Sequence, residues 1–525
     1  MLFNSYLFIF IFLPMVLILW FSLNKMKWHK TAEVFLIGMS LWFYAYFNFS
    51  YLFIIVGSCL FNFLISYFIN TIQKKILNLR TEDIYLINKS IDDNHLNVSN
   101  QNKKIHNDTI NNKNIKIKLL GIFGISVNLG ILFYYKYFDF FIENINVIFN
   151  KDYNLKHILL PLGISFFTFQ QLSYVIDRMK GEAPHYGLIE YMSFVTFFPQ
   201  LIAGPIVLHS ELIPQFRDME KRKFNAENFT DGCVQAILGF GKKVLIADTL
   251  ALVVNQAYYN RYYFTTWSAL LFILTYIFEL YFDFSGYCDI AMGVGKMFNF
   301  YIPRNFNYPY KATSMKDFWN RWHITLNRFF TTYVYIPLGG NKKGTARKIG
   351  NIMIVFLLSG LWHGASWNFV IWGLLNGIGV VFNNINPKPL KNKFLSWLFT
   401  FSYILFTFIF FRCETLNDVD IVLKGLINPV GIKFVVDMAQ YMDIPELYIF
   451  KRVLEIVAPG LIRSMYMFAF TFVMIICALL LRGKNAEDIV KEGNHTTKKA
   501  IGLAVILIWS VISLSGVSTF LYFNF

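Results

Sequence analysis

Long apolar runs recur along the whole chain, and short polar stretches separate them. A membrane-spanning helix needs ~20 consecutive apolar residues, and many of these runs approach that length. A membrane β-barrel would instead show ~10-residue segments of alternating polarity. The pattern therefore predicts an all-α polytopic membrane protein, with apolar segments at 7–21, 34–69, 119–137, 158–175, 188–207, 233–258, 267–300, 349–382, 394–411, 464–482 and 500–523.

Three of these segments depart from a plain span. Residues 34–69 are long enough for two helices joined by a tight turn. Residues 158–175 contain Pro, Gly, Ser, Thr and Gln, which predicts a buried or re-entrant helix beside a cavity. Residues 197–205 contain two prolines and a glycine, so we expect regular helix to break there.

Polar sections interrupt the apolar pattern and suggest where the chain divides into separate parts. Residues 70–118 are rich in Asn and lack apolar periodicity, which predicts a disordered cytoplasmic insert. Residues 301–348 and 412–463 contain no spanning run, so both are expected at the membrane interface, with an amphipathic helix at 416–427. The predicted divisions are N-terminal membrane helices (1–69), the insert (70–118), a core (119–411), an interfacial section (412–463), and C-terminal membrane helices with an aromatic tail (464–525).

Composition supports the membrane class and narrows the function. The chain is 56% hydrophobic, well above the level of soluble domains. Its net charge of +16 comes from basic residues that lie mostly between apolar runs, as in cytoplasmic loops, and no nucleic-acid-binding pattern accompanies them. Its five cysteines are scattered without metal-ligand spacing, so no metal site is expected. No basic residue precedes Lys25, so the first apolar run is read as a retained membrane helix.

Two aromatic-histidine strings are the main chemical candidates. His323 ends the string 318–323, and His363 lies in the string 359–364. A histidine can act as a general base near neutral pH, and an ionisable group at membrane depth is a functional candidate. Taken singly, His363 could bridge helices and His323 could anchor at the interface. Together they favour one shared site, with neighbouring candidates Trp319, Asn320, Arg321, Trp322, Ser359 and Trp362.

Charged residues near these strings allow two interpretations. Glu279 and Asp283 share one helix face, and with Asp289 they could line a polar cavity or a proton path. They could equally form structural pairs with Arg304, Arg321 or Lys296. The basic residues Lys342, Lys343, Arg347 and Lys348 could contact a phosphorylated donor, or reflect only the positive charge of cytoplasmic loops. The glycines Gly286, Gly293 and Gly295 suggest close helix packing.

Five ordered motifs carry a family resemblance. Residues 281–287, 305–310, 318–326, 335–341 and 359–369 resemble the membrane-bound O-acyltransferases (MBOAT). Residues 198–206 and the aromatic ending 520–525 are similar to the alginate O-acetyltransferase branch, which is close to peptidoglycan O-acetyltransferases. The insert 70–118 is not part of the family pattern. The resemblance covers residues 1–69 and 119–525.

The resemblance implies a fold of about 11 membrane helices, with re-entrant and interfacial helices, around a transmembrane tunnel. It implies that His363 is the general base and that His323 orients or stabilises the acyl group. No cofactor is expected to be bound, and acetyl-CoA is the expected cytosolic donor. The acetyl group would cross the bacterial inner membrane to an exported polysaccharide, alginate-like or peptidoglycan. A periplasmic partner similar to SGNH hydrolases would complete the transfer.

Two rival functions stay open at this stage. One is D-alanine transfer to teichoic acid, as in the D-alanyl branch of the same family. The other is a transporter or proton-coupled channel that uses Glu279, Asp283, Asp289 and the two histidines. Replacement of His363 would leave a transporter with its flux, whereas an acyltransferase would keep its fold and lose transfer.

Overall fold

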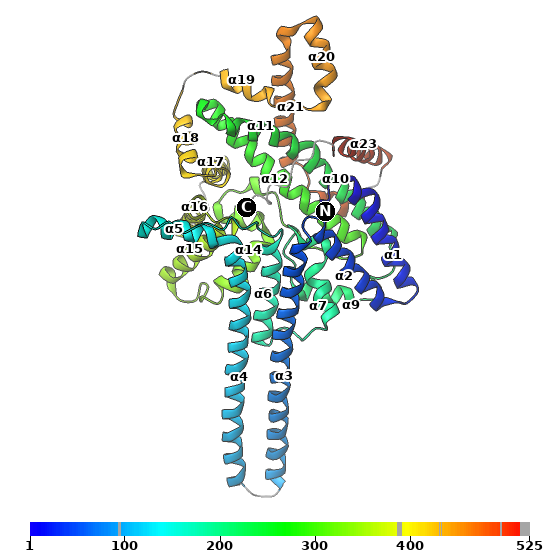
Figure 1. The fold of residues 1–525 in the computed structure, drawn as a ribbon, viewed down its shortest axis with the longest axis vertical. Helices are drawn as coiled ribbons and strands as arrows, with labels where there is room; N and C mark the ends of the chain where they lie inside the picture. Colours follow the sequence, from blue (N-terminus) through cyan, green and yellow to red (C-terminus); the bar gives the residue numbers. More distant parts are fainter. Residues whose placement is uncertain (93–95, 386–390, 430, 432, 494–495, 515–525) are drawn as a thin grey trace. The chain divides into compact units, whose positions relative to one another are not determined.

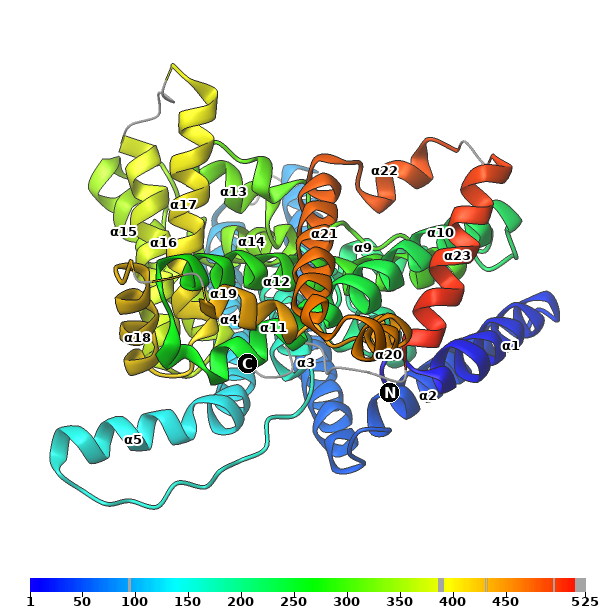
Figure 2. The same cartoon turned by 90° about the horizontal axis from the view of Figure 1, so that it is seen from above.

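The computed structural model describes residues 1–92, 96–385, 391–429, 431, 433–493 and 496–514, so the aromatic ending 520–525 lies outside the described residues. The described part is built of helices without strands (Figures 1 and 2). It forms two compact units, one of 1–25, 203–206 and 220–525, and one of 26–202 and 207–219. Seven of its helices are long and apolar enough to cross a membrane. The all-α membrane class is confirmed, and the expected number of about 11 membrane helices stays a prediction.

The smaller unit is organised around a long pair of helices. In Figure 1, α3 and α4 lie side by side over most of their length. The helices of this unit are α2 (His29–Ala45), α3 (Ser50–Asp92), α4 (Leu96–Leu132), α5 (Phe138–Phe149), α6 (Ile164–Lys180), α7 (Leu188–Thr196), α8 (Phe198–Leu201) and α9 (His209–Arg217).

The expected disordered insert is helical wherever the structure describes its backbone. Residues 70–92 continue α3, and residues 96–118 begin α4. At the two ends of this section, an apolar cluster packs α3 against α4. Ile65, Ile69 and Ile76 on α3 form a buried cluster with Ile117 on α4 and Val175 on α6. A spacing of four and seven residues places the three α3 side chains on one helix face.

The polar segment near residue 164 is a buried helix, as predicted. The whole N-terminal part of α6, from Ile164 to Val175, is buried. Its polar groups bond to neighbouring helices: the Gln171 side-chain oxygen accepts from Ser58 at 3.0 Å. Gly163 starts the helix at φ 71°, where a Cβ atom would lie 2.8 Å from the Leu201 carbonyl oxygen. Only glycine adopts this positive φ easily and also leaves room for the carbonyl oxygen.

The predicted helix break at 197–205 is also present. Helix α7 ends at Thr196, the short α8 follows, and residues 202–208 are not helical.

The larger unit packs around α12, a 32-residue helix whose neighbours include α10, α11, α17 and α18. Figure 2 shows α15, α16 and α17 side by side in the same unit. Its helices are α1 (Leu13–Lys25), α10 (Ala226–Phe240), α11 (Asp248–Tyr259), α12 (Thr266–Met297), α13 (Met315–Arg321), α14 (Ile324–Phe330), α15 (Gly344–His363), α16 (Trp367–Ile385), α17 (Lys393–Arg412), α18 (Leu416–Leu426), α19 (Lys433–Gln440), α20 (Tyr448–Val457), α21 (Ile462–Arg482), α22 (Ala486–Lys491) and α23 (Thr497–Ser513).

Glycines allow α12 to approach α10 closely, as the sequence predicted. A Cβ atom on Gly286 would lie 2.9 Å from the Gly239 carbonyl oxygen, and one on Gly293 would lie 2.6 Å from that of Gly232. Small residues four or seven apart bring helix backbones together in membranes. The sections 301–348 and 412–463 contain only short helices before α15 and α21, so neither provides a span there.

Candidate active site

His323 is held in an unusual backbone conformation at the junction of two short helices. Helix α13 ends before Trp322, and α14 begins at Ile324. His323 caps α14 at φ 46°, a left-handed conformation that is uncommon for residues other than glycine. Its side chain is buried, at 1% exposure. Strained backbone of this kind concentrates at functional sites, where the surrounding structure holds it.

Asn305 fixes the orientation of the His323 ring. The Asn305 side-chain oxygen lies 3.2 Å from His323 Nδ1. The same oxygen accepts from the Thr325 backbone N–H at 3.1 Å and from the Thr325 hydroxyl at 2.9 Å. Because a backbone N–H can only donate, the Asn305 atom facing it must be the oxygen. His323 Nδ1 must then carry the hydrogen.

This assignment sets the chemistry of His323. A neutral imidazole with hydrogen on Nδ1 carries its lone pair on Nε2. Burial lowers the pKa of His323 to about 3, which favours the neutral ring. His323 is thus arranged to present Nε2 as a hydrogen-bond acceptor. Asn305 was missed as a site residue; the only hint in the sequence is its place in the motif 305–310.

His363 is held differently, at the end of a helix and among aromatic rings. It is the last residue of α15 and is 2% exposed. The ring centroids of Trp372 and Phe411 lie 5.0 and 5.1 Å from its own. Helix α15 reaches α16 closely because both helices carry glycine at the crossing, Gly360 and Gly373.

The structure brings the two predicted histidines together. Their ring centroids are 6.4 Å apart, although the residues are 40 positions apart in sequence. Trp362 contacts both rings, at 5.8 Å from His323 and 4.9 Å from His363. The shared site is therefore present in space, and the chemical role of each histidine stays a prediction.

Two other predicted residues lie at this site. Trp319 and Ser359 line a small cavity of about 10 Å³ together with His323. Trp319 also packs against Trp372, at 5.6 Å between ring centroids. Trp322, by contrast, is part of an aromatic core, with its ring 5.0 Å from that of Phe306.

Two predicted lining residues are placed elsewhere. Asn320 is exposed. Arg321 forms an ion pair with Asp317 at 2.7 Å, one turn earlier on α13. A helix as short as α13 can turn only one face inward, and Phe318, Trp319 and Trp322 occupy that side. The predicted lining role of Asn320 and Arg321 is therefore corrected.

Two of the three predicted acids on α12, Asp283 and Asp289, form structural ion pairs, but not with the expected partners. Lys243 contacts Asp283 at 2.5 Å and Asp248 at 2.8 Å. Lys242 contacts Asp289 at 2.6 Å. Both lysines come from the turn of π-helix after α10, inside an apolar run where their role was overlooked. Asp283 is thus held in a buried charge cluster, which corrects its expected lining role and weakens the transporter hypothesis.

The predicted donor contacts lie on the surface. Lys342, Lys343 and Arg347 are exposed, and Lys348 is half-buried. Arg347 donates to the Leu338 carbonyl oxygen at 3.2 Å, which ties α15 to the loop before it. These four residues do not line the cavity beside His323 or the cavities along α12, and their role in donor binding stays a prediction.

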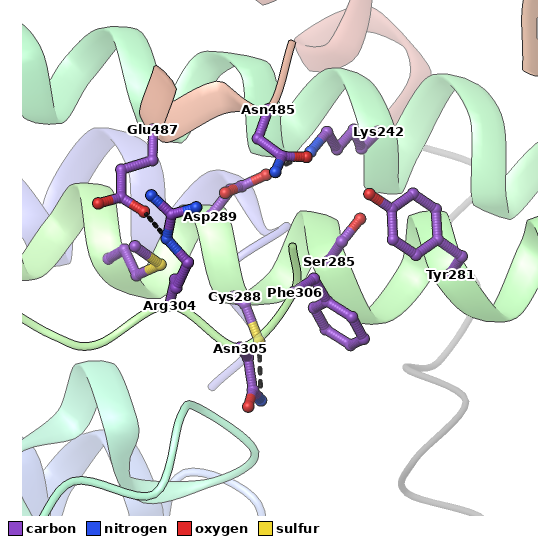
Figure 3. A pocket seen from close by; sticks show the side chains of 11 residues that line it. Lys242, Tyr281, Ser285, Cys288, Asp289, Arg304, Asn305, Phe306, Asn485 and Glu487 are labelled. Carbon is purple, nitrogen blue, oxygen red and sulfur yellow. Dashed lines mark hydrogen bonds and ion pairs between the residues drawn. The ribbon is translucent and has the colours of Figure 1, made fainter. Parts of the chain in front are cut away.

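A second, more polar cavity adjoins the histidine site. Figure 3 shows side chains from α12, from residues 304–306 and from the segment around α22 converging on it. Asn305, which bonds to His323, forms part of its wall and also donates to Cys288 Sγ at 3.6 Å. Other side chains of the wall are Lys242, Tyr281, Ser285, Asp289, Arg304, Phe306, Asn485 and Glu487. Among the described residues, no group of three or more His, Cys, Asp and Glu could hold a metal ion.

Comparison with known proteins gives consistent matches. Residues 179–413 match the family model described as MBOAT, membrane-bound O-acyltransferase family. A peptidoglycan O-acetyltransferase of Helicobacter pylori is 34% identical over 100% of this chain and 98% of its own length. The aligned length therefore includes residues 70–118.

Other relatives match about half of the chain. A probable alginate O-acetylase of Pseudomonas aeruginosa is 40% identical over 56% of this chain and 58% of its own length. A teichoic acid D-alanyltransferase of Streptococcus thermophilus is 29% identical over 49% of this chain and 69% of its own length.

Proposed function

Because this chain belongs to the membrane-bound O-acyltransferase family and is a multi-pass bacterial membrane enzyme with an O-acetyltransferase role, we propose that it takes acetyl from cytosolic acetyl-CoA. The acetyl group crosses the inner membrane and is used to O-acetylate an exported polysaccharide. The full-length similarity to a peptidoglycan enzyme favours peptidoglycan, with an alginate-like glycan as the second possibility. A periplasmic partner similar to SGNH hydrolases accepts the acetyl group and completes the transfer.

One observation carries this proposal: two buried histidines meet inside an aromatic enclosure. In the proposed step, His363 removes the proton from an acceptor hydroxyl, either a sugar hydroxyl or a serine of the partner. The hydroxyl oxygen forms an ester bond with the acetyl carbon, the carbon–sulfur bond of the thioester breaks, and the thiolate takes up the proton. Trp362, Trp372 and Phe411 around His363 exclude water, which would otherwise hydrolyse the thioester.

His323 has a positioning role in this scheme. With its Nδ1 hydrogen given to Asn305, it presents Nε2 beside Trp362 and His363. An Nε2 lone pair can accept a hydrogen bond from the acceptor hydroxyl or from the amide of the donor, and so fix the reacting atoms.

Charge on the larger unit supports a cytosolic donor. Contacts of Lys221 with Asn299 and of Arg304 with Glu487 gather several segments at the C-terminal end of α12. That end carries Lys221, Arg222, Lys223, Lys296, Arg304 and Lys491. The opposite end of α12 has Arg261, Arg412 and Lys424 beside it. By the positive-inside rule, the first end faces the cytosol.

The proposal is tested by acetyl transfer from radiolabelled acetyl-CoA in membranes that contain the partner and the glycan. Wild type should label the glycan or the partner, and His363→Ala should not, at equal expression. His157→Ala is the matched control because His157 is exposed, and it should transfer normally. Equal labelling with His363→Ala would refute His363 as the base. Labelling by none of the proteins would refute acetyl-CoA as the donor.

A further inference from the structure

A lysine-rimmed cavity of about 240 Å³ lies at the C-terminal end of α12. A cavity needs roughly 10–15 Å³ to hold one water, so this cavity has room for a small anionic group such as a diphosphate. Three ammonium groups, those of Lys221, Lys296 and Lys491, line it together with the side chains of Asn228 and Tyr301. Lysine is a common partner of phosphate groups.

The wall of this cavity is built by a specific set of hydrogen bonds. Asn299 has φ 64°, a left-handed conformation that turns the chain directly after α12. Its side-chain amide donates to the carbonyl oxygens of Lys221 and Lys223, at 3.1 and 2.5 Å. It also accepts from Asn228 at 3.1 Å. These bonds hold the segment of Lys221 against the end of α12, so the lysines are placed before any ligand arrives.

The three ammonium groups are arranged to bind an anion. Lys296 contacts Asp231 at 2.6 Å, Lys491 contacts Glu487 at 2.6 Å, and Lys221 donates to the Asn299 carbonyl oxygen at 3.2 Å. Because an ammonium group has three N–H donors, these contacts leave each lysine with donors for a ligand.

This outer cavity continues towards the histidines. Met292 and Glu487 line both it and the inner cavity of Figure 3, so the two cavities adjoin. Arg304 pairs with Glu487 at 2.7 Å where they meet. Asn305 lies in the wall of the inner cavity and bonds to His323. The outer cavity therefore adjoins the inner cavity, which is small at about 20 Å³ and is separated from His323 by its wall residue Asn305.

We propose that the outer cavity binds the phosphate groups of the acyl donor. This rests on the proposed function, because it takes the donor to be a phosphorylated thioester such as acetyl-CoA. It moves the phosphate contacts from the exposed loop with Lys342 and Lys343 to a cavity that adjoins the inner cavity beside Asn305.

The test is binding of radiolabelled acetyl-CoA to the purified full chain in detergent, which does not require turnover. Lys221→Gln with Lys491→Gln should weaken binding on the order of tenfold or more, since each change removes a hydrogen bond from a charged donor. It should also flatten the dependence of binding on salt. Lys342→Gln with Lys343→Gln is the matched control with the same change in charge, and should bind like wild type. Lys296→Gln is a second variant, with its melting temperature as a check on folding.

Each outcome decides the proposal. Weaker binding in the cavity variants alone supports it. Weaker binding in the loop variant alone, or equal binding in all proteins, overturns it while acetyl-CoA remains the donor. Absence of binding by wild type overturns the cavity assignment and acetyl-CoA together. The O-acetyl content of the exported glycan in cells with and without this protein then tests the acetyltransferase function separately, because it does not depend on which donor is used.

Discussion

The surroundings of the two histidines differ in kind. His323 is held by polar contacts and by a strained left-handed backbone, and Asn305 determines which ring nitrogen carries hydrogen. His363 is held by packing, between Trp362, Trp372 and Phe411 at the end of α15. The difference indicates a division of labour. A fixed acceptor suits a group that positions the reactants, whereas a ring enclosed by aromatic side chains suits the proposed base, because the enclosure keeps water away from the proton transfer.

The largest expected effect comes from removing the proposed base. His363→Ala should lower the acetyl-transfer rate by about 10²–10⁴-fold, which is the usual contribution of general acid–base catalysis. His323→Ala should reduce transfer less, because it removes positioning and leaves the base in place. Rates of acetyl transfer at saturating acetyl-CoA compare the two variants. A greater loss in His323→Ala would reverse the assigned roles.

Asn305 provides the next test, because it acts through His323. Asn305→Leu should lower the transfer rate roughly 10- to 100-fold, since a misplaced or misoriented group can cost about that much. Asn305→Asp keeps an acceptor oxygen and should restore part of the rate.

The pH profile distinguishes a positioning role for Asn305 from a structural one. Burial lowers the pKa of His323, so wild type should show no loss of activity from its protonation near neutral pH. A carboxylate at position 305 favours the protonated ring and raises the pKa of His323. Activity of Asn305→Asp should therefore fall as pH decreases through the raised pKa, because protonation removes the Nε2 lone pair. An unchanged profile would mean that Asn305 serves only the fold.

The helix crossing that positions His363 gives the next test. A change there should lower the stability of the fold and reduce acetyl transfer less than the changes above. A Cβ atom on Gly373 would overlap the Phe356 carbonyl oxygen at the crossing of α15 and α16. Gly373→Ala should cost about 1–3 kcal/mol, the usual range for overpacking, and reduce transfer while leaving the pH profile unchanged. Gly350→Ala is the control on α15, because nothing lies within 4 Å of the added methyl group. Melting temperatures in detergent compare the two, and equal values would contradict close packing at Gly373.

The sequence predicted the elements that follow from local patterns. Apolar runs gave the all-α membrane class, and polar residues in 158–175 gave the buried helix α6. The helical part of 70–118 was missed because Ile76 and Ile117 are far apart in sequence, and their pairing depends on how α3 and α4 associate. The motif identified His323 and His363 but not Asn305, since a hydrogen bond over 18 positions has no signature in a single sequence.

The same limit explains the incorrect prediction for Asn320, and it gives the smallest expected effect. Asn320 stands between Trp319, which lines the small cavity, and Arg321, which pairs with Asp317. Asn320 belongs to the same motif as these neighbours, so the sequence alone predicts the same role for it. The turn of α13 instead exposes its side chain. Asn320→Ala should therefore change the transfer rate by less than about twofold and alter stability by at most ~0.5 kcal/mol, as for surface substitutions in general. Trp319→Ala beside it should cause a clear loss of transfer. A large loss in Asn320→Ala would show that this exposed position contacts a substrate or the partner, and the inward-facing side of α13 would then not define the site.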